Sequence, residues 1–180
     1  MTRDAVVVVS GIPGSGKTTL ARPLARALGL PLVSKDTIKE ALFDALGTGD
    51  LEWSGRLGRA SHTVMYALVW DLGPVVLESH FWAGVSEADL RALARPLVQV
   101  YCSCPLDLAI ARYDARIGNP ARHRGHRPDH QSADATAAWR TAQPAPLALD
   151  GPLIQVDTAR PVDVGAVAAR VRDAITRRTA

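Results

Sequence analysis

The segment GIPGSGKTT, residues 11–19, places glycines, a lysine and three hydroxyl groups within nine residues. It fits the pattern G-x-x-x-x-G-K-[ST], and it lies between an apolar run and a segment with helical spacing. In that context, backbone N–H groups can surround phosphate oxygens, and the helix N-terminus adds partial positive charge. The alternative is an ordinary glycine-rich turn between a strand and a helix. The predicted phosphate contacts are Gly11, Gly14, Ser15, Gly16, Lys17, Thr18 and Thr19.

Three side chains of this loop have separate expected roles. Lys17 would bring a full positive charge to the β- and γ-phosphates. Thr18 would offer its hydroxyl to Mg²⁺, and Thr19 would lie near the α-phosphate. We therefore expect ATP and Mg²⁺ as ligands.

Asp36 follows the second apolar segment, at the edge of the expected sheet where ligands of open α/β sheets bind. A carboxylate there would face the γ-phosphate and could accept the proton of an attacking hydroxyl. The alternative is a helix N-cap, which Thr37 could supply instead. Asp36 is thus a candidate general base.

Three further side chains are candidates for acceptor binding. Lys39 lies three residues after Asp36, on the same helical face, and could hold a transferring phosphate or an anionic acceptor. Glu78 ends the apolar run PVVL, a Walker-B-like position near a metal, and His80 follows at the same rim. Each could equally be a solvated or structural side chain.

An arginine-rich segment indicates a lid. Arg112 and Arg116 have i, i+4 spacing on an expected helix and are candidate catalytic groups that stabilise charge on the γ-phosphate. Residues 117–130 are rich in Gly, Pro, Arg and His, and could fold over ATP and exclude water. The alternatives are a solvated basic loop or a metal site at His123, His126 and His130. No matching carboxylate or cysteine set favours a metal.

Strands and helices alternate along the chain, which predicts βαβ units and a three-layer α/β/α domain. Val6–Val9 is unalternating and β-branched, as in a strand covered on both faces. Pro23 should kink the first helix. The expected strands are 6–9, 30–34, 74–79, 97–103 and 153–157. The expected helices are 17–28, 37–46, 57–72, 86–94, 104–116, 132–142 and 161–175. Thr37 and Glu40 have capping-box spacing, a glycine-containing loop is expected over 48–55, and Val64, Leu68 and Leu72 are the expected apolar stripe of the third helix.

Composition limits the function classes. The 180 residues suit one domain, 1–180, and the net charge of +3 is too small to imply nucleic acid by itself. The apolar run 5–9 is too short for a signal peptide, and no segment reaches the roughly 18 apolar residues of a membrane helix. We expect a cytoplasmic protein whose Cys102 and Cys104 are reduced packing residues.

These features together resemble the small P-loop kinases, AAA-type ATP-binding kinases of the zeta-toxin-like, polynucleotide-kinase-like and chloramphenicol-phosphotransferase-like branch. The likeness spans about 5–175. The resemblance implies sheet order 2-3-1-4-5, ATP with Mg²⁺, Asp36 as base and Arg112 or Arg116 as lid arginine. The chain departs from the polynucleotide kinases at Lys39, where they usually carry arginine. The segments that carry the likeness are SGIPGSGKTTLARPLARAL, SKDTIKEAL, VVLESHF, ARYDAR and LIQVDT.

Three functions fit these expectations. The first is transfer of the γ-phosphate of ATP to a hydroxyl of a metabolite, nucleoside or antibiotic. The second is a 5′-hydroxyl polynucleotide kinase, which would need stacking aromatics, whereas only 5% of residues are aromatic. The third is a non-catalytic, ATP-binding regulatory or toxin-type module. No Asn-Lys-x-Asp signature of a GTPase is present.

Overall fold

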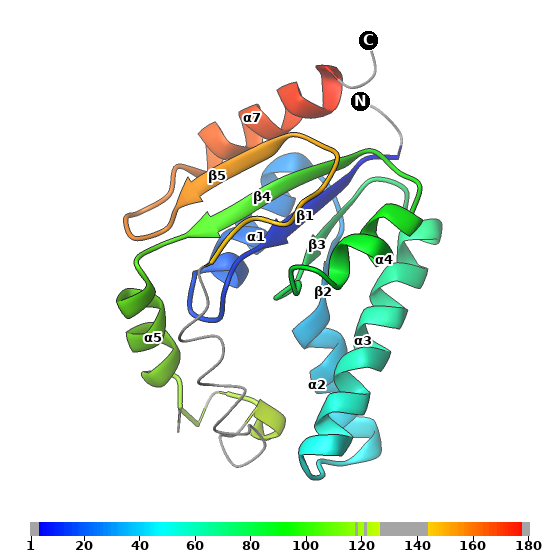
Figure 1. Ribbon diagram of the computed structural model, residues 1–180, viewed down its shortest axis with the longest axis vertical. Coiled ribbons are helices and arrows are strands. Elements are labelled where there is room, and N and C mark those ends of the chain that lie inside the picture. The colour runs from blue at the N-terminus through cyan, green and yellow to red at the C-terminus, as the bar shows by residue number, and fades with distance from the viewer. Residues whose placement is uncertain (1–3, 118, 121, 127–143, 178–180) are drawn as a thin grey trace.

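A computed structural model describes residues 4–117, 119–120, 122–126 and 144–177. Its five-stranded parallel sheet has the order β2-β3-β1-β4-β5, which confirms the predicted fold class and order (Figure 1). The carboxyl ends of all strands therefore meet at one edge, where ligand-binding loops gather. The strands are β1 Val6–Ser10, β2 Leu32–Ser34, β3 Val75–Glu78, β4 Leu97–Ser103 and β5 Leu153–Asp157.

Helices cover both faces of the sheet (Figure 1). The helices α1 and α7 pack on one face, and α3 and α4 pack on the other. Successive residues of β1 point to opposite faces, so Val7 and Val9 enter one core while Val6 and Val8 enter the other. The helices are α1 Lys17–Leu28, α2 Lys35–Leu46, α3 Leu51–Leu72, α4 Ser86–Ala92, α5 Leu106–Asp114, the 3₁₀ turn η1 Arg124–His126, and α7 Val164–Arg177.

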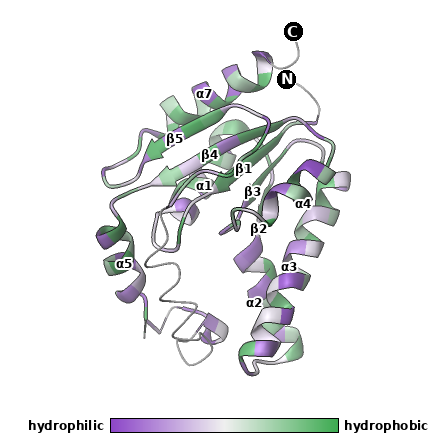
Figure 2. Ribbon diagram, viewed as in Figure 1, coloured by the Kyte–Doolittle hydropathy of each residue, from purple (hydrophilic) through white to green (hydrophobic). Residues whose placement is uncertain are grey.

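Hydropathy follows this layering. In Figure 2 the strands are mostly hydrophobic, whereas the parts of α2 and α3 farthest from the sheet carry many hydrophilic residues. No helix in the described part of the chain combines the length and the apolar character needed to cross a bilayer.

Two helix boundaries differ from the sequence expectation. The helix α2 begins at Lys35, so the predicted Thr37–Glu40 capping box does not form, and Asp36 lies in the first turn. The helix α3 begins at Leu51 rather than 57, because Asp50 caps it and its carboxylate accepts a hydrogen bond from Trp53 N at 2.8 Å. The predicted loop over 48–55 is therefore mostly helix.

The predicted apolar stripe on α3 is also wrong. Val64, Leu68 and Leu72 are exposed, whereas Met65 and Val69 pack into the core. Both sets have helical spacing, and periodicity alone did not distinguish the face that meets the sheet. The helix α1 continues without interruption across Pro23. The helix predicted near 132–142 lies outside the described residues.

Candidate functional site

A cleft of about 1160 Å³ opens at the carboxyl edge of the sheet. Residues of α1, α2 and α3, the rim after β3, and the segment from α5 to η1 line it. Figure 1 shows α5 on one side of this region and α2 with α3 on the other. The predicted site residues that line it are Lys17, Thr18, Asp36, Lys39, His80 and Arg116.

The glycine-rich loop has the geometry of an anion cradle. Gly14 has φ of +83°, and a Cβ there would lie 2.0 Å from Ala109 O of α5, so only glycine fits. The buried Ser15 Oγ has no hydrogen-bond partner among the described residues. Thr158 Oγ1, after β5, donates to Ser15 O at 2.7 Å, and this hydrogen bond fixes the loop to the segment after β5.

Lys17 lies at the start of α1 with its side chain largely buried. Its ammonium donates to Ile12 O at 3.3 Å. Burial lowers the pKa of Lys17, and the charges of Glu78 and Asp36 oppose that shift. An ammonium held inside a cradle of backbone donors is suited to a phosphate.

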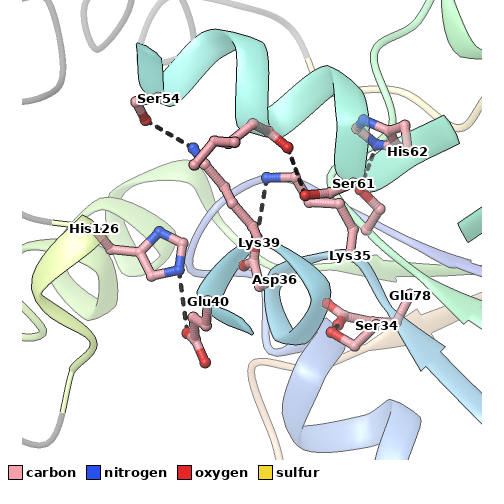
Figure 3. Close-up of polar contacts among 12 residues, drawn as sticks. Ser34, Lys35, Asp36, Lys39, Glu40, Ser54, Ser61, His62, Glu78 and His126 are labelled. Atoms are coloured by element: carbon pink, nitrogen blue, oxygen red, sulfur yellow. Dashed lines mark hydrogen bonds and ion pairs between the residues drawn. The ribbon is translucent and has the colours of Figure 1, made fainter. Parts of the chain in front are cut away.

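Glu78 is 1% exposed and connects two elements. Its Oε1 accepts from Thr18 Oγ1 at 3.0 Å, and its Oε2 accepts from Ser34 Oγ at 2.6 Å. Figure 3 shows Glu78 and Ser34 meeting beneath α2. The carboxylate thus lies beside the hydroxyl that sequence reasoning assigns to Mg²⁺.

The residues present fit ATP and Mg²⁺. The unpartnered Ser15 hydroxyl and the glycine cradle suit phosphate oxygens. Thr18 and Glu78 supply oxygen ligands, which Mg²⁺ prefers together with waters. No group of three or more His, Cys, Asp or Glu gathers to hold a metal within the described ranges. Of the three histidines considered as an alternative metal site, His123 and His126 pair with carboxylates of α2, and His130 is not described.

Asp36 faces the cleft from the first turn of α2, and its side chain is 55% exposed. Lys35 Nζ pairs with it at 3.1 Å. Burial would raise the pKa of Asp36, but the positive charges of Lys35, His126 and Lys17 hold it at about 2. The carboxylate is therefore anionic at neutral pH.

Lys39 lies one turn further along α2 and reaches across to α3. Its Nζ donates to Ser54 Oγ at 2.8 Å, as Figure 3 shows, and lies 5.2 Å from the centre of the Phe43 ring. Burial and the neighbouring charge of Lys35 lower its pKa to about 8, although Asp36 acts in the opposite direction.

His80 lies at the rim after β3. Its Nδ1 lies 3.2 Å from Gly11 O, and its Nε2 is buried without a partner among the described atoms. Burial and the charge of Lys17 lower its pKa to about 4, so the ring is neutral. The half-exposed Trp82 packs edge-on against it at 4.4 Å.

The two predicted lid arginines lie in different places in the structure. The helix α5 ends at Asp114, so Arg116 lies in a turn, and the i, i+4 alignment does not hold. Arg112 donates to Thr158 O at 3.0 Å and does not line the cleft in the described structure. Arg116 lines the cleft, and its charge contributes to the lowered pKa of Lys17.

The described part of the lid packs onto α2. The rings of Phe43 and His123 stack at 5.8 Å, and a Cβ on Gly125 would meet the Phe43 ring at 2.2 Å. His126 Nε2 contacts Glu40 Oε1 at 3.1 Å, as Figure 3 shows. Burial lowers the pKa of His126 to about 4.

Sequence reasoning missed several cleft residues. On α3, His62 Nε2 contacts Ser79 Oγ at 3.0 Å, while Tyr66 and Arg59 lie on the same cleft wall. Arg122 joins Arg116 over the Tyr113 ring. A loop was expected at 48–55 instead of a helix that starts at 51. Such a helix aligns Ser54, Gly58 and His62 on one side, and this alignment would have indicated the α3 wall of the cleft.

Comparison with known proteins places this geometry in a family. The model of the AAA domain family matches residues 6–143. A solved structure of a provisionally assigned kinase from Chloroflexus aurantiacus has a TM-score of 0.85 and 33% identity, covering 97% of this chain and 99% of that one. A gluconokinase from Sinorhizobium meliloti shares the fold with a TM-score of 0.58 at 19% identity, covering 99% of each chain.

A cytidylate kinase from Ignicoccus hospitalis is 33% identical over 120 residues, covering 63% of this chain and 65% of the relative. The chain matches less than two thirds of the length of the curated cytidylate kinases. The chain belongs to the AAA domain family, and its fold is that of the P-loop kinases.

Proposed function

We propose that the protein transfers the γ-phosphate of ATP to a hydroxyl group of a small molecule. The observation that carries this proposal is an anionic carboxylate, Asp36, in the same cleft as the phosphate-loop lysine. The charges of the two groups act on each other. A hydroxyl bound against Asp36 would be directed toward phosphates held at Lys17.

Asp36 favours a hydroxyl over a phosphate as the acceptor. A phosphate monoester is already ionised at neutral pH and would be repelled by a carboxylate beside its attacking oxygen. A hydroxyl must lose a proton and benefits from a hydrogen-bond acceptor. The cytidylate kinase relatives make a nucleoside monophosphate the second candidate acceptor.

Because the pKa of Asp36 is low, its carboxylate is better suited to orienting the acceptor hydroxyl than to removing the proton of that hydroxyl early. Transfer through a loose transition state leaves the proton on the hydroxyl until late in the reaction. Asp36 would first accept the hydroxyl hydrogen bond, hold the oxygen in line, and take the proton as the new bond forms. Lys35, paired with Asp36 at 3.1 Å, would keep the carboxylate charged.

Other side chains would bind and shield the phosphates. Lys17 and Arg116 would stabilise charge on the transferring group, with Arg122 as a further candidate. Thr18 and Glu78 would hold Mg²⁺, which neutralises charge on phosphate oxygens when bound. The lid segment would exclude water from the reaction.

An acceptor screen tests the proposal. The protein with MgATP is incubated with sugars, polyols, hydroxy acids, nucleosides, aminoglycosides and nucleoside monophosphates. ADP release identifies the acceptors that react, and mass spectrometry then identifies each product. The expected product carries a phosphate ester on a former hydroxyl. Exclusive formation of nucleoside diphosphates would overturn the hydroxyl assignment. Bound ATP without any transfer would favour the non-catalytic module.

A further inference from the structure

Lys39 and Arg59 each place a positive charge close to a glycine on the cleft-facing side of α3. Gly55 and Gly58 are three residues apart on the helix and both line the cleft. A Cβ on Gly58 would lie 3.9 Å from Lys39 Nζ, and one on Gly55 would lie 3.7 Å from an Arg59 guanidinium nitrogen. The helix surface therefore places two positive charges over a floor without side chains.

Lys39 has no anionic partner in the described part of the chain. Its Nζ donates to the neutral Ser54 hydroxyl, and the nearby carboxylate of Asp36 pairs with Lys35. The ammonium is half-buried, and a charge removed from water without an opposite charge is unfavourable. An anion in the cleft would remove that cost.

Arg59 completes the arrangement. It forms no ion pair with any described residue, and it lines the same cleft from the next turn of α3. A guanidinium supplies paired N–H donors that match the two oxygens of a carboxylate or phosphate. Glycines within a helix are less stabilising than alanine, and here they leave an open floor that a ligand can occupy.

We infer that Lys39 and Arg59 form an anion-binding subsite, and that the acceptor is a compact hydroxylated molecule that carries a carboxylate or a phosphate. This inference rests on the proposed function and names the substrate class for the same cleft. Asp36 would take the hydroxyl end, and the Lys39–Arg59 subsite would take the acidic end.

The spacing along α2 limits the size of the acceptor. Asp36 and Lys39 are three residues apart, which is about 4.5 Å along a helix axis. A small acceptor could therefore contact both side chains at once. Hydroxy acids and phosphorylated polyols meet this condition, whereas a long polymer would have to bend sharply.

Other cations also line the cleft: Lys17 belongs to the phosphate loop, and Arg22 lies on α1. Lys35 pairs with Asp36, and Arg116 and Arg122 lie over the Tyr113 ring on the opposite wall. If Lys39 only joined α2 to α3 through its hydrogen bond to Ser54, the charge of a ligand would not change its binding affinity. The test therefore compares ligands that share a carbon skeleton and differ in whether they carry an acidic group.

Calorimetric titration gives the direct test. With Mg²⁺ and a non-hydrolysable ATP analogue occupying the phosphate loop, the probes are glycerate, glycerol 3-phosphate and glycerol, which share a three-carbon skeleton. We expect at least one of the two acids to bind at least tenfold more tightly than glycerol. The tighter acid distinguishes a carboxylate from a phosphate ligand. If neither acid binds more tightly than glycerol, the inference is overturned.

Substitutions locate the binding. Lys39→Met and Arg59→Met should each weaken binding of the acid at least tenfold and leave glycerol unchanged. Arg56→Met is the matched control, because the Arg56 guanidinium packs over Trp53 and does not line the cleft. It should change the dissociation constant by less than twofold. Equal effects of all three substitutions would also overturn the inference.

Transfer assays separate this inference from the proposed function. If charge-dependent binding through Lys39 and Arg59 is found but no hydroxyl is ever phosphorylated, the proposed function fails and the subsite stands. If neutral alcohols are phosphorylated as fast as acids and the substitutions have no effect, the subsite fails and the proposed function stands.

Discussion

At the residue scale, Glu78 shows how a buried carboxylate is held beside the hydroxyl that is proposed to bind Mg²⁺. It accepts hydrogen bonds from Thr18 at the start of α1 and from Ser34 at the end of β2. A buried charge is tolerated only where such partners satisfy it. The same contacts fix the Thr18 hydroxyl close to an anionic oxygen.

Glu78→Gln should raise the Mg²⁺ concentration needed for half-maximal activity at least tenfold. The amide keeps one hydrogen-bond acceptor and the side-chain volume but removes the charge that attracts the cation. Magnesium titrations of ATP turnover measure the effect. Glu87→Gln, at a buried carboxylate of α4 that does not line the cleft, is the control and should leave the magnesium requirement unchanged. An unchanged requirement in Glu78→Gln would remove Glu78 from the metal site.

The pKa of Lys39, near 8, predicts how acceptor binding depends on pH. Below pH 8 the ammonium is protonated and attracts the acid, and binding should weaken as the pH rises from 7 to 9.5. Lys39→Arg should remove that dependence, because a guanidinium remains charged over this range. Measurements of KM for the acidic acceptor against pH provide the check. A flat profile in the unsubstituted protein would contradict the role of Lys39.

At the element scale, the glycines of α3 lower the stability of the helix but leave the cleft wall open. Gly58→Ala should stabilise the fold by up to about 1 kcal/mol, because alanine is the better helix former and its Cβ contacts only Lys39 Nζ at 3.9 Å. The same methyl group should weaken binding of the acidic acceptor. Urea denaturation and calorimetric titration measure the two effects.

Ala60→Gly, on the exposed side of the same helix, is the matched control for Gly58→Ala. It should lose about 1 kcal/mol of stability without changing ligand binding. Stabilisation by Gly58→Ala with unchanged binding would show that the space above Gly58 is not used by the ligand.

Element order followed from the sequence because its signals were local. The valines of β1, the glycine loop and the alternation of strands and helices predicted the elements and the three-layer class, whereas the sheet order came from the resemblance to the P-loop kinases. The start of α3 was missed because glycines at 49 and 55 resemble a loop, whereas the Asp50 cap begins the helix at 51. The segment 44–66 was expected to help build the acceptor pocket, but its cleft residues Arg59, His62 and Tyr66 were not singled out.

The lid illustrates a second limit of sequence reasoning. Arg112 and Arg116 differ in position because α5 ends between them, a boundary that no residue type marked. The packing of Gly125 on Phe43 joins residues more than eighty positions apart, and local spacing carries no information about such a contact. The positions of Asp36, Lys39 and His80 at the cleft followed correctly from the strand ends.

At the scale of the whole molecule, nucleotide binding should stabilise the fold. MgATP at about a hundred times its dissociation constant contributes about 2.7 kcal/mol. For a domain of this size that corresponds to a rise in Tm of about 5–10 °C. Thermal unfolding with and without MgATP measures the shift, and Lys17→Ala should abolish most of it. A full shift in Lys17→Ala would place the nucleotide elsewhere.

The central claim is that Asp36 turns a nucleotide-binding cleft into a phosphotransferase. Asp36→Asn keeps the side-chain volume and removes the charge that accepts a proton. With any acceptor found in the screen, transfer of labelled γ-phosphate should fall at least a hundredfold, while calorimetry shows ATP affinity within threefold of the unsubstituted protein. Full transfer activity in Asp36→Asn would contradict the account.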